Sequence, residues 1–139
     1  MNDLVFFIDR CLGKHFIVDA LKQTGITIEI HDDHFSQSTL DTEWIPEIGR
    51  RGWIILTKDA NIGRNHLERQ ALARAGIRMF TLVSQNLSGE DMAAIFRIAI
   101  PNIQKFISKY PAPFIAKVYR NSKVKAWKNS TDLLDEIDS

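Results

Sequence analysis

Short apolar runs alternate along the chain with segments whose apolar residues recur at helical spacing. Each run is the length of one strand and is bounded by polar or turn-forming residues, as expected of a strand covered on both faces. The runs span residues 4–9, 26–31, 53–57 and 77–83. Helical spacing follows each run, through segments 12–21, 42–51, 67–75 and 92–106. This alternation predicts a three-layer α/β fold with a central, mostly parallel sheet and helices on both of its faces.

Capping signals place the ends of two predicted helices. Asn65 and Glu68 have the spacing of a capping box, and Gly76 stands where the same helix is expected to end. Ser88, with Asp91 three residues later, is expected to open a longer helix. These signals favour helices at both places independently of the apolar spacing.

The C-terminal part of the chain has a different pattern. Residues 114–120 and 123–128 alternate between apolar and polar positions on either side of Asn121-Ser122, which predicts an antiparallel β-hairpin. Residues 130–139 are acidic, and we expect them to fray. We therefore divide the chain into a domain of residues 1–110 and an extension of residues 111–139. The hairpin is basic and has no acidic residue; its cations are Lys117, Arg120, Lys123, Lys125 and Lys128.

Composition narrows the class of protein. A chain of 139 residues with 45% hydrophobic residues suits one domain with a real core. Its net charge of +1 gives no overall basic field that would drive the protein onto nucleic acid or a membrane. A single cysteine, Cys11, and an N-terminal segment without a long apolar core lead us to expect a soluble, cytoplasmic protein.

Acidic residues follow the predicted strands. Right-handed β-α-β connections leave the carboxyl ends of parallel strands at one edge of the sheet, where open α/β sheets bind their ligands. Carboxylates gathered at that edge would repel one another unless an ion offset their charge, and hard divalent ions such as Mg²⁺ and Mn²⁺ prefer oxygen ligands. The acidic residues at the predicted strand ends, or at the start of the short helix that feeds the same edge, are Asp9, Asp32, Asp33, Asp41, Glu43 and Asp59.

Each of these residues also has a purely structural interpretation. Aspartate after a strand is a common turn residue, and Asp41 and Glu43 suit the first turn of any helix because of the helix dipole. The turn interpretation is weakest for Asp9, which has neither glycine nor proline beside it. Lys58 and Arg64 are either solvated or contacts for a phosphate group.

Several spaced motifs carry a resemblance to a known family. DRCLGK (9–14), HDDHF (31–35), DTEW (41–44), RRGWIILTKD (50–59) and NLSGEDM (86–92) resemble the PIN-like nuclease domains of the VapC type, which are toxins of bacterial toxin–antitoxin pairs. The likeness covers roughly residues 4–105. It departs from the family pattern after the fourth predicted strand, where residues 84–86 are Ser-Gln-Asn rather than a clear further acid. Asp33 is the candidate replacement.

The resemblance implies a metal-dependent endoribonuclease with an α/β/α PIN-like domain. Asp9, Asp41 and Asp59 would take the acidic positions that bind Mg²⁺ or Mn²⁺, with Glu43 beside Asp41 and Asp33 as a further candidate ligand. Lys58 and Arg64 would hold the scissile phosphate. The expected partners are an RNA substrate and a cognate antitoxin protein, and a homodimer is compatible with the pattern. The alternative is a non-catalytic PIN-like module that uses the same edge to bind RNA or a protein.

Two interpretations of the basic hairpin also remain open. Lysines on an edge ribbon prevent strands of different molecules from pairing. A cationic face that also carries aromatic residues suits single-stranded RNA, since lysines neutralise phosphates and rings stack on bases.

Overall fold

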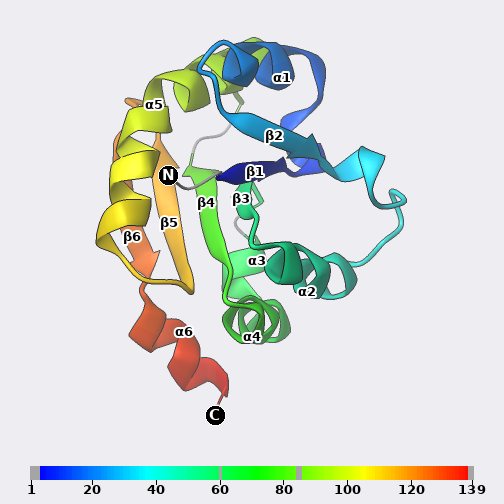
Figure 1. Cartoon of the computed structure of the whole chain (residues 1–139), viewed down its shortest axis with the longest axis vertical. Coiled ribbons are helices and arrows are strands. Elements are labelled where there is room, and N and C mark those ends of the chain that lie inside the picture. Colours follow the sequence, from blue (N-terminus) through cyan, green and yellow to red (C-terminus); the bar gives the residue numbers. More distant parts are fainter. Residues whose placement is uncertain (1–3, 60, 84–85, 138–139) are drawn as a thin grey trace.

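A single six-stranded sheet organises the computed structural model of this protein, which describes residues 4–59, 61–83 and 86–137 (Figure 1). The strand order is β2-β1-β3-β4-β5-β6. Neighbouring strands are parallel up to β5, and β6 pairs with β5 in the antiparallel direction. The predicted fold class is therefore confirmed. The strands are β1 (Val5–Ile8), β2 (Thr27–Ile30), β3 (Ile54–Thr57), β4 (Arg78–Val83), β5 (Phe114–Tyr119) and β6 (Val124–Lys128).

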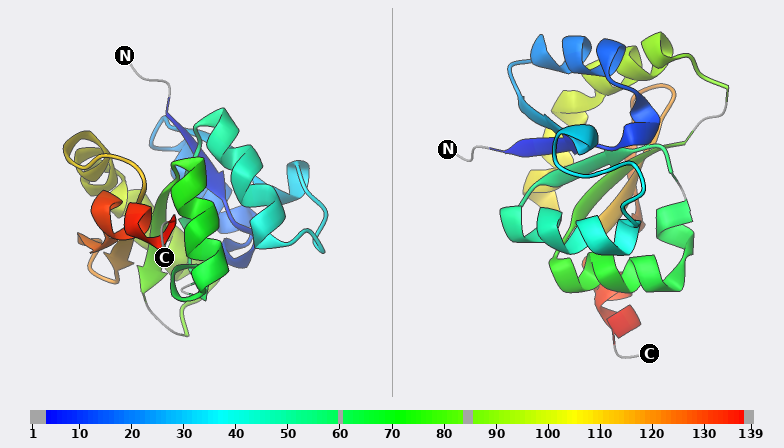
Figure 2. Two further views of the ribbon diagram at one scale, coloured as in Figure 1. Left: turned by 90° about the horizontal axis from the view of Figure 1, so that it is seen from below. Right: turned by 90° about the vertical axis from the view of Figure 1, so that its right-hand side faces the viewer.

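Helices cover both faces of the sheet. Figure 2 shows the three layers, with α1 and α5 on one side of the sheet and α2 and α4 on the other. The short α3 and the C-terminal α6 join the α2 and α4 side, and two single-turn 3₁₀ helices follow β1 and β2. The helices are η1 (Arg10–Leu12), α1 (His15–Lys22), η2 (His31–Asp33), α2 (Asp41–Arg51), α3 (Asn61–Arg64), α4 (His66–Ala75), α5 (Gly89–Lys109) and α6 (Ser130–Ile137).

Alternating side chains of the central strands fill two separate cores. In β1, Phe6 and Ile8 pack beneath α1 and α5, whereas Phe7 packs beneath α2 and α4. In β3, Leu56 packs beneath α1 and α5, and Ile55 packs beneath α2 and α4. Because both faces are buried, these strands are apolar except for Thr57 at the end of β3, which explains their continuous apolar runs in the sequence.

The hairpin extends the sheet rather than standing apart from it. β5 pairs in parallel with β4 along its whole length, from Arg78 opposite Phe114 to Val83 opposite Tyr119. The hairpin itself is confirmed, with Ser122 in its turn at a positive φ of 67°. The division of the chain at residue 110 stays a prediction. No helix in the described part of the chain is long and apolar enough to cross a membrane.

The expectation that the acidic C-terminal segment frays is wrong up to residue 137. Residues 130–137 form α6, in which Leu133 is fully buried. Its first turn is capped reciprocally, because Asn129 Oδ1 accepts the Asp132 amide (2.9 Å) and Asp132 Oδ2 accepts the Asn129 amide (3.0 Å). The remaining acidic residue of the segment, Asp138, lies outside the described residues.

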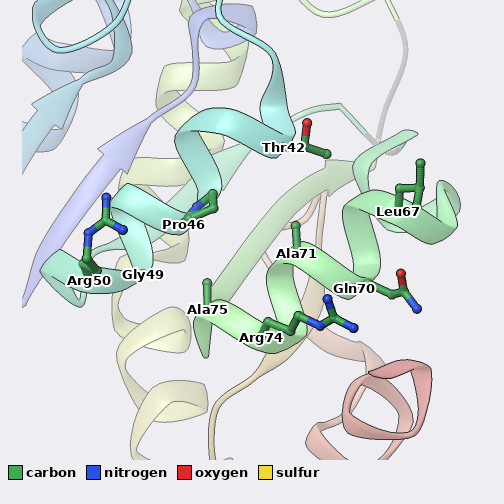
Figure 3. A pocket seen from close by; sticks show the side chains of 9 residues that line it. All are labelled: Thr42, Pro46, Gly49, Arg50, Leu67, Gln70, Ala71, Arg74 and Ala75. Atoms are coloured by element: carbon green, nitrogen blue, oxygen red, sulfur yellow. The ribbon is translucent and has the colours of Figure 1, made fainter. Parts of the chain in front are cut away.

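The packing of α2 against α4 depends on a glycine. A Cβ atom at Gly49 would lie 2.5 Å from both the Cβ and the carbonyl oxygen of Ala75, so the two helices could not approach as they do. Their outer surfaces leave a groove of about 710 Å³, which Figure 3 shows with Pro46 on one wall and Leu67 on the other. This contact sets the distance between the two helices, which each carry one acidic residue of the site described below.

We expect Gly49→Ala to destabilise the protein. Overpacking costs roughly 1 to 3 kcal/mol, and here the clash includes a backbone oxygen that cannot move independently, so the cost should exceed the gain of about 1 kcal/mol in helix propensity. Thermal melts would show a lower Tm than that of the wild type. Gly89→Ala is the matched control, because its added Cβ would meet only the ring of Phe16, which is 54% exposed and free to turn. An equal loss in both variants would contradict the assignment.

Candidate active site

The carboxylate of Asp9 is held rigidly at the carboxyl end of β1. The Asp9 amide donates to the Leu56 carbonyl group of β3 at 3.0 Å. Asp9 Oδ1 accepts the Arg10 amide (2.8 Å), and Oδ2 accepts the Thr57 hydroxyl group (2.8 Å). Asp9 is 9% exposed, so its orientation is set by these neighbours rather than by solvent.

Thr57 links the ends of β1 and β3. Its hydroxyl group donates to Asp9 and accepts the backbone amide of Asp59 (3.0 Å), so one buried side chain positions both acidic segments. Cys11 Sγ lies 3.3 Å from the same hydroxyl group. Burial, followed by the charge of Asp9, raises the pKa of the Cys11 thiol to about 11, so Cys11 is a neutral thiol and not a thiolate nucleophile at neutral pH.

Asp41 and Glu68 meet across the ends of α2 and α4. Asp41 begins α2, and its Oδ1 accepts the indole N–H of the buried Trp44 (2.9 Å). Asp41 and Glu68 line one cleft of about 330 Å³. The pKa of Glu68 is raised to about 7, first by burial, then by its contact with the Asp41 carboxyl group and by the charges of Asp41 and Asp59.

The negative charge of Asp41 also affects the pKa of Asp9. Burial is the largest cause of its raised pKa, the hydrogen bond from Thr57 acts in the opposite direction, and the charge of Asp41 raises the pKa further. Asp9 therefore senses Asp41, which in turn faces Glu68. Asp9, Asp41, Asp59 and Glu68 form one electrostatically coupled group, the acidic cluster, at the carboxyl edge of the sheet.

Comparison with known proteins agrees with this geometry. A family model described as a PIN like domain matches residues 4–84, which is more than half of the chain. A protein of Mycobacterium tuberculosis (strain ATCC 25618 / H37Rv), named "Putative ribonuclease VapC45", is 31% identical over 123 residues, which cover 86% of this chain and 88% of the relative. The chain is a PIN-like domain of the VapC type. No solved structure matches it.

Glu68 is the acidic residue of this PIN-like domain that sequence reasoning missed. Half of the predicted capping box is present, because Asn65 Oδ1 accepts the Glu68 amide at 3.1 Å. The Glu68 carboxyl group, however, belongs to the acidic cluster, and its Oε2 is buried with no hydrogen-bond partner among the described residues. In the sequence, the spacing of Glu68 from Asn65 indicated only helix capping and gave no sign that Glu68 belongs to the acidic cluster. The family pattern has a further acid after β4, which this chain lacks; here residues 84 and 85 lie outside the described residues and Asn86 is exposed.

The structure gives Asp32 and Glu43 other contacts. Asp32 pairs with Arg10 (2.8 Å) and Lys14 (2.9 Å), and the hydrogen bond from Lys14 is the largest cause of its lowered pKa. Glu43 is exposed, and its Oε1 caps α2 by accepting the Leu40 amide at 3.2 Å. The catalytic role predicted for Glu43 stays a prediction.

The remaining predicted site residues, Asp33, Lys58 and Arg64, are exposed. Asp33 ends η2, Lys58 follows β3 and Arg64 ends α3. Lys58 is exposed, and its backbone amide donates to Cys11 Sγ at 3.4 Å. The roles predicted for Asp33 in metal binding and for Lys58 and Arg64 in phosphate binding stay predictions.

The C-terminal helix braces the corner that joins α3 to α4. Glu136 of α6 accepts Arg69 Nε (2.7 Å) and contacts His66 Nδ1 (2.7 Å). Arg69 also donates from Nη1 to the Gly63 carbonyl group (3.2 Å). Because Gly63 lies shortly after Asp59, and Arg69 directly follows Glu68, these contacts position two residues of the acidic cluster.

The donor chemistry of the acidic cluster fits a hard divalent ion. All its donors are carboxylate oxygens, and a cation would offset both their repulsion and the burial of the unpartnered Glu68 Oε2. Within the described residues, however, no three His, Cys, Asp or Glu side chains are already close enough together to hold one ion.

We expect the metal-free protein to lose stability as the pH rises from about 4.5 to about 7. Over this range the unfolded chain releases the Glu68 proton, whereas the folded state retains it, so the contribution of Glu68 is complete below about 4.5 and lost through about 7. Glu68→Gln cannot ionise. In EDTA it should therefore raise Tm relative to the wild type at pH 8 and much less at pH 5.

Glu43→Gln is the control for this experiment, because its carboxyl group is exposed and caps α2. Its effect on Tm should be small and similar at both pH values. A Glu68→Gln effect that does not depend on pH would contradict the raised pKa of Glu68.

Proposed function

We propose that this PIN-like domain is a divalent-metal-dependent endoribonuclease that hydrolyses phosphodiester bonds of RNA. The observation that carries the proposal is the acidic cluster, whose buried or half-buried, mutually repelling carboxyl groups include a glutamate with a pKa raised to about 7. Strongly perturbed acids in a cleft are typical of functional sites. The name of the Mycobacterium tuberculosis relative, a ribonuclease, supports this choice of reaction.

In this proposal the acidic cluster, Asp9, Asp41, Asp59 and Glu68, holds Mg²⁺ or Mn²⁺. A bound ion would polarise the phosphate group and lower the pKa of an attacking water molecule. Thr57 keeps the Asp9 carboxylate oriented, and Trp44 does the same for Asp41. Lys58 and Arg64, exposed on either side of Asp59 in the sequence, would contact the substrate phosphate.

We further propose that the domain is the toxin of a toxin–antitoxin pair. The VapC name of the relative supports this role. A nuclease of this kind must be silenced, and an inhibitor that places an arginine or lysine among the carboxylates would occupy the position of the ion.

One observation favours a second candidate, a non-catalytic module that binds RNA or protein. No ion-sized group of three ligands is formed among the described residues, so the acids could serve a basic partner instead of a metal. Binding of Mn²⁺ without turnover of RNA would support this candidate.

We expect Asp9→Asn and Asp59→Asn to reduce RNA cleavage by about 100-fold or more, because loss of a residue that only orients a metal ligand costs about 10–100-fold and these are direct ligands. Both variants should remain folded, since removing one charge also relieves repulsion. Cleavage of single-stranded RNA, calorimetry with Mn²⁺ and thermal melts would measure the three effects. Asp32→Asn is the control, because its charge is already balanced by Arg10 and Lys14. Wild-type cleavage by Asp9→Asn would rule out the assignment.

We expect expression of the wild-type chain to slow bacterial growth, and the Asp9→Asn variant to be harmless. Co-expression with the product of the neighbouring reading frame should restore growth and yield a stable complex. The toxin role would lose its basis if the wild-type chain, highly expressed and active on RNA in vitro, neither slowed growth nor bound that product.

A further inference from the structure

A row of polar side chains crosses the sheet from the acidic cluster to the basic hairpin. The row starts at Asp9, which accepts the hydroxyl hydrogen bond of Thr57. Thr57 is paired in register with Thr81 of β4. Thr81 is paired with Lys117 of β5, which faces Lys125 of β6. Since neighbouring strands lie about 4.8 Å apart, Lys117 is roughly 10 Å and Lys125 roughly 15 Å from Thr57.

The two lysines of this row are not explained by the stability of the sheet. Like charges directly opposite each other on neighbouring strands are unfavourable. Protection of the sheet edge accounts for Lys125 but not for Lys117, because β5 lies between β4 and β6. Among the described residues, neither lysine takes part in an ion pair.

Aromatic rings hold both lysines on the same face of the hairpin. Lys117 Nζ lies 4.5 Å from the centre of the Trp127 ring, and Lys125 Nζ lies 5.8 Å from the centre of the Tyr119 ring. Tyr119 and Trp127 are partly exposed. The hairpin therefore presents ammonium groups and aromatic surface together, which are the two components of single-stranded nucleic acid sites.

The hairpin also touches the segment that carries Asp59. The ring of Trp127 packs directly on Gly63 of α3, where any Cβ atom would overlap it. α3 begins two residues after Asp59. The cationic and aromatic face of β5 and β6 thus contacts the segment that follows Asp59 of the acidic cluster.

We infer that Lys117, Lys125 and Tyr119 bind a single-stranded stretch of RNA adjoining the bond that reaches the acidic cluster. The ammonium groups neutralise its phosphates, and the Tyr119 ring stacks on a base. The choice of RNA as ligand rests on the proposed function. The positions rest on the strand register and on the contact between Trp127 and Gly63.

The test measures RNA binding without cleavage, in EDTA, with the full chain and a short fluorescein-labelled oligouridine over a series of KCl concentrations. Lys117→Gln/Lys125→Gln should reduce the slope of log affinity against log salt by about 1.4, since each phosphate contact on a single strand contributes about 0.7. Tyr119→Leu should weaken binding with little change in slope, because it removes stacking and no charge.

Lys22→Gln/Arg97→Gln is the matched control. Lys22 ends α1 and Arg97 lines the groove between α1 and α5, and both are exposed and away from the hairpin, so their loss should leave the slope unchanged. Melts would verify folding of each variant. If the Lys117 and Lys125 double variant does not fold, Lys125→Gln alone, on the exposed edge strand, should reduce the slope by about 0.7.

Three results would overturn the inference: no oligouridine binding by the wild type, an unchanged slope in the Lys117 and Lys125 variants, or an equal loss in the Lys22 and Arg97 variant. Loss of a protein complex with an unchanged slope would assign the two lysines to protein contact.

If the wild type binds oligouridine but does not cleave it with Mg²⁺ or Mn²⁺, the proposed nuclease function fails while the inference stands. If the wild type cleaves RNA but the slope is unchanged in the lysine variants, the nuclease function stands and the inference fails.

Discussion

Repulsion between carboxyl groups at one edge of a parallel sheet is the constraint on which the structure depends. The residues of the acidic cluster would move apart if they were not held in place, and fixed contacts with the rest of the fold hold them together. Thr57 joins Asp9 to the segment of Asp59. The close approach of α2 and α4 at Gly49 sets Asp41 against Glu68. The rest of the fold, including α6 and its clamp on Arg69, keeps these supports in place.

The basic residues nearest to Asp9 in the chain do not neutralise the acidic cluster. Arg10 and Lys14, which follow Asp9 in the chain, pair with Asp32. Burial and the charges of Asp41 and Asp59 raise the pKa of Glu68, and no cation among the described residues forms an ion pair with it. A cation that neutralised the cluster would therefore also stabilise the folded chain.

Local pattern was sufficient to predict most of the fold but only part of the site. Apolar runs and capping residues predicted the strands and helices because both depend on neighbours in the sequence. Asp9 stood out since nothing local explained it. Glu68 did not, because its spacing from Asn65 already had a local explanation. The helix α6 was missed for a related reason: Glu136 looked solvated, but its cations, Arg69 and His66, lie about seventy residues earlier.

The lysines of the hairpin show why register matters more than composition. Alternation along each strand assigned Lys117 and Lys125 to faces of a hairpin, but no local pattern could place that hairpin beside β4. Once β5 pairs with β4, the same alternation aligns the lysines with Thr57 and Thr81. The sheet then has negative charge at the end of β1, where Asp9 lies, and positive charge on β5 and β6, separated by buried threonines. In a chain with a net charge of +1, this separation of charge along one sheet would let the proposed metal site and the inferred RNA-binding surface coexist without neutralising each other.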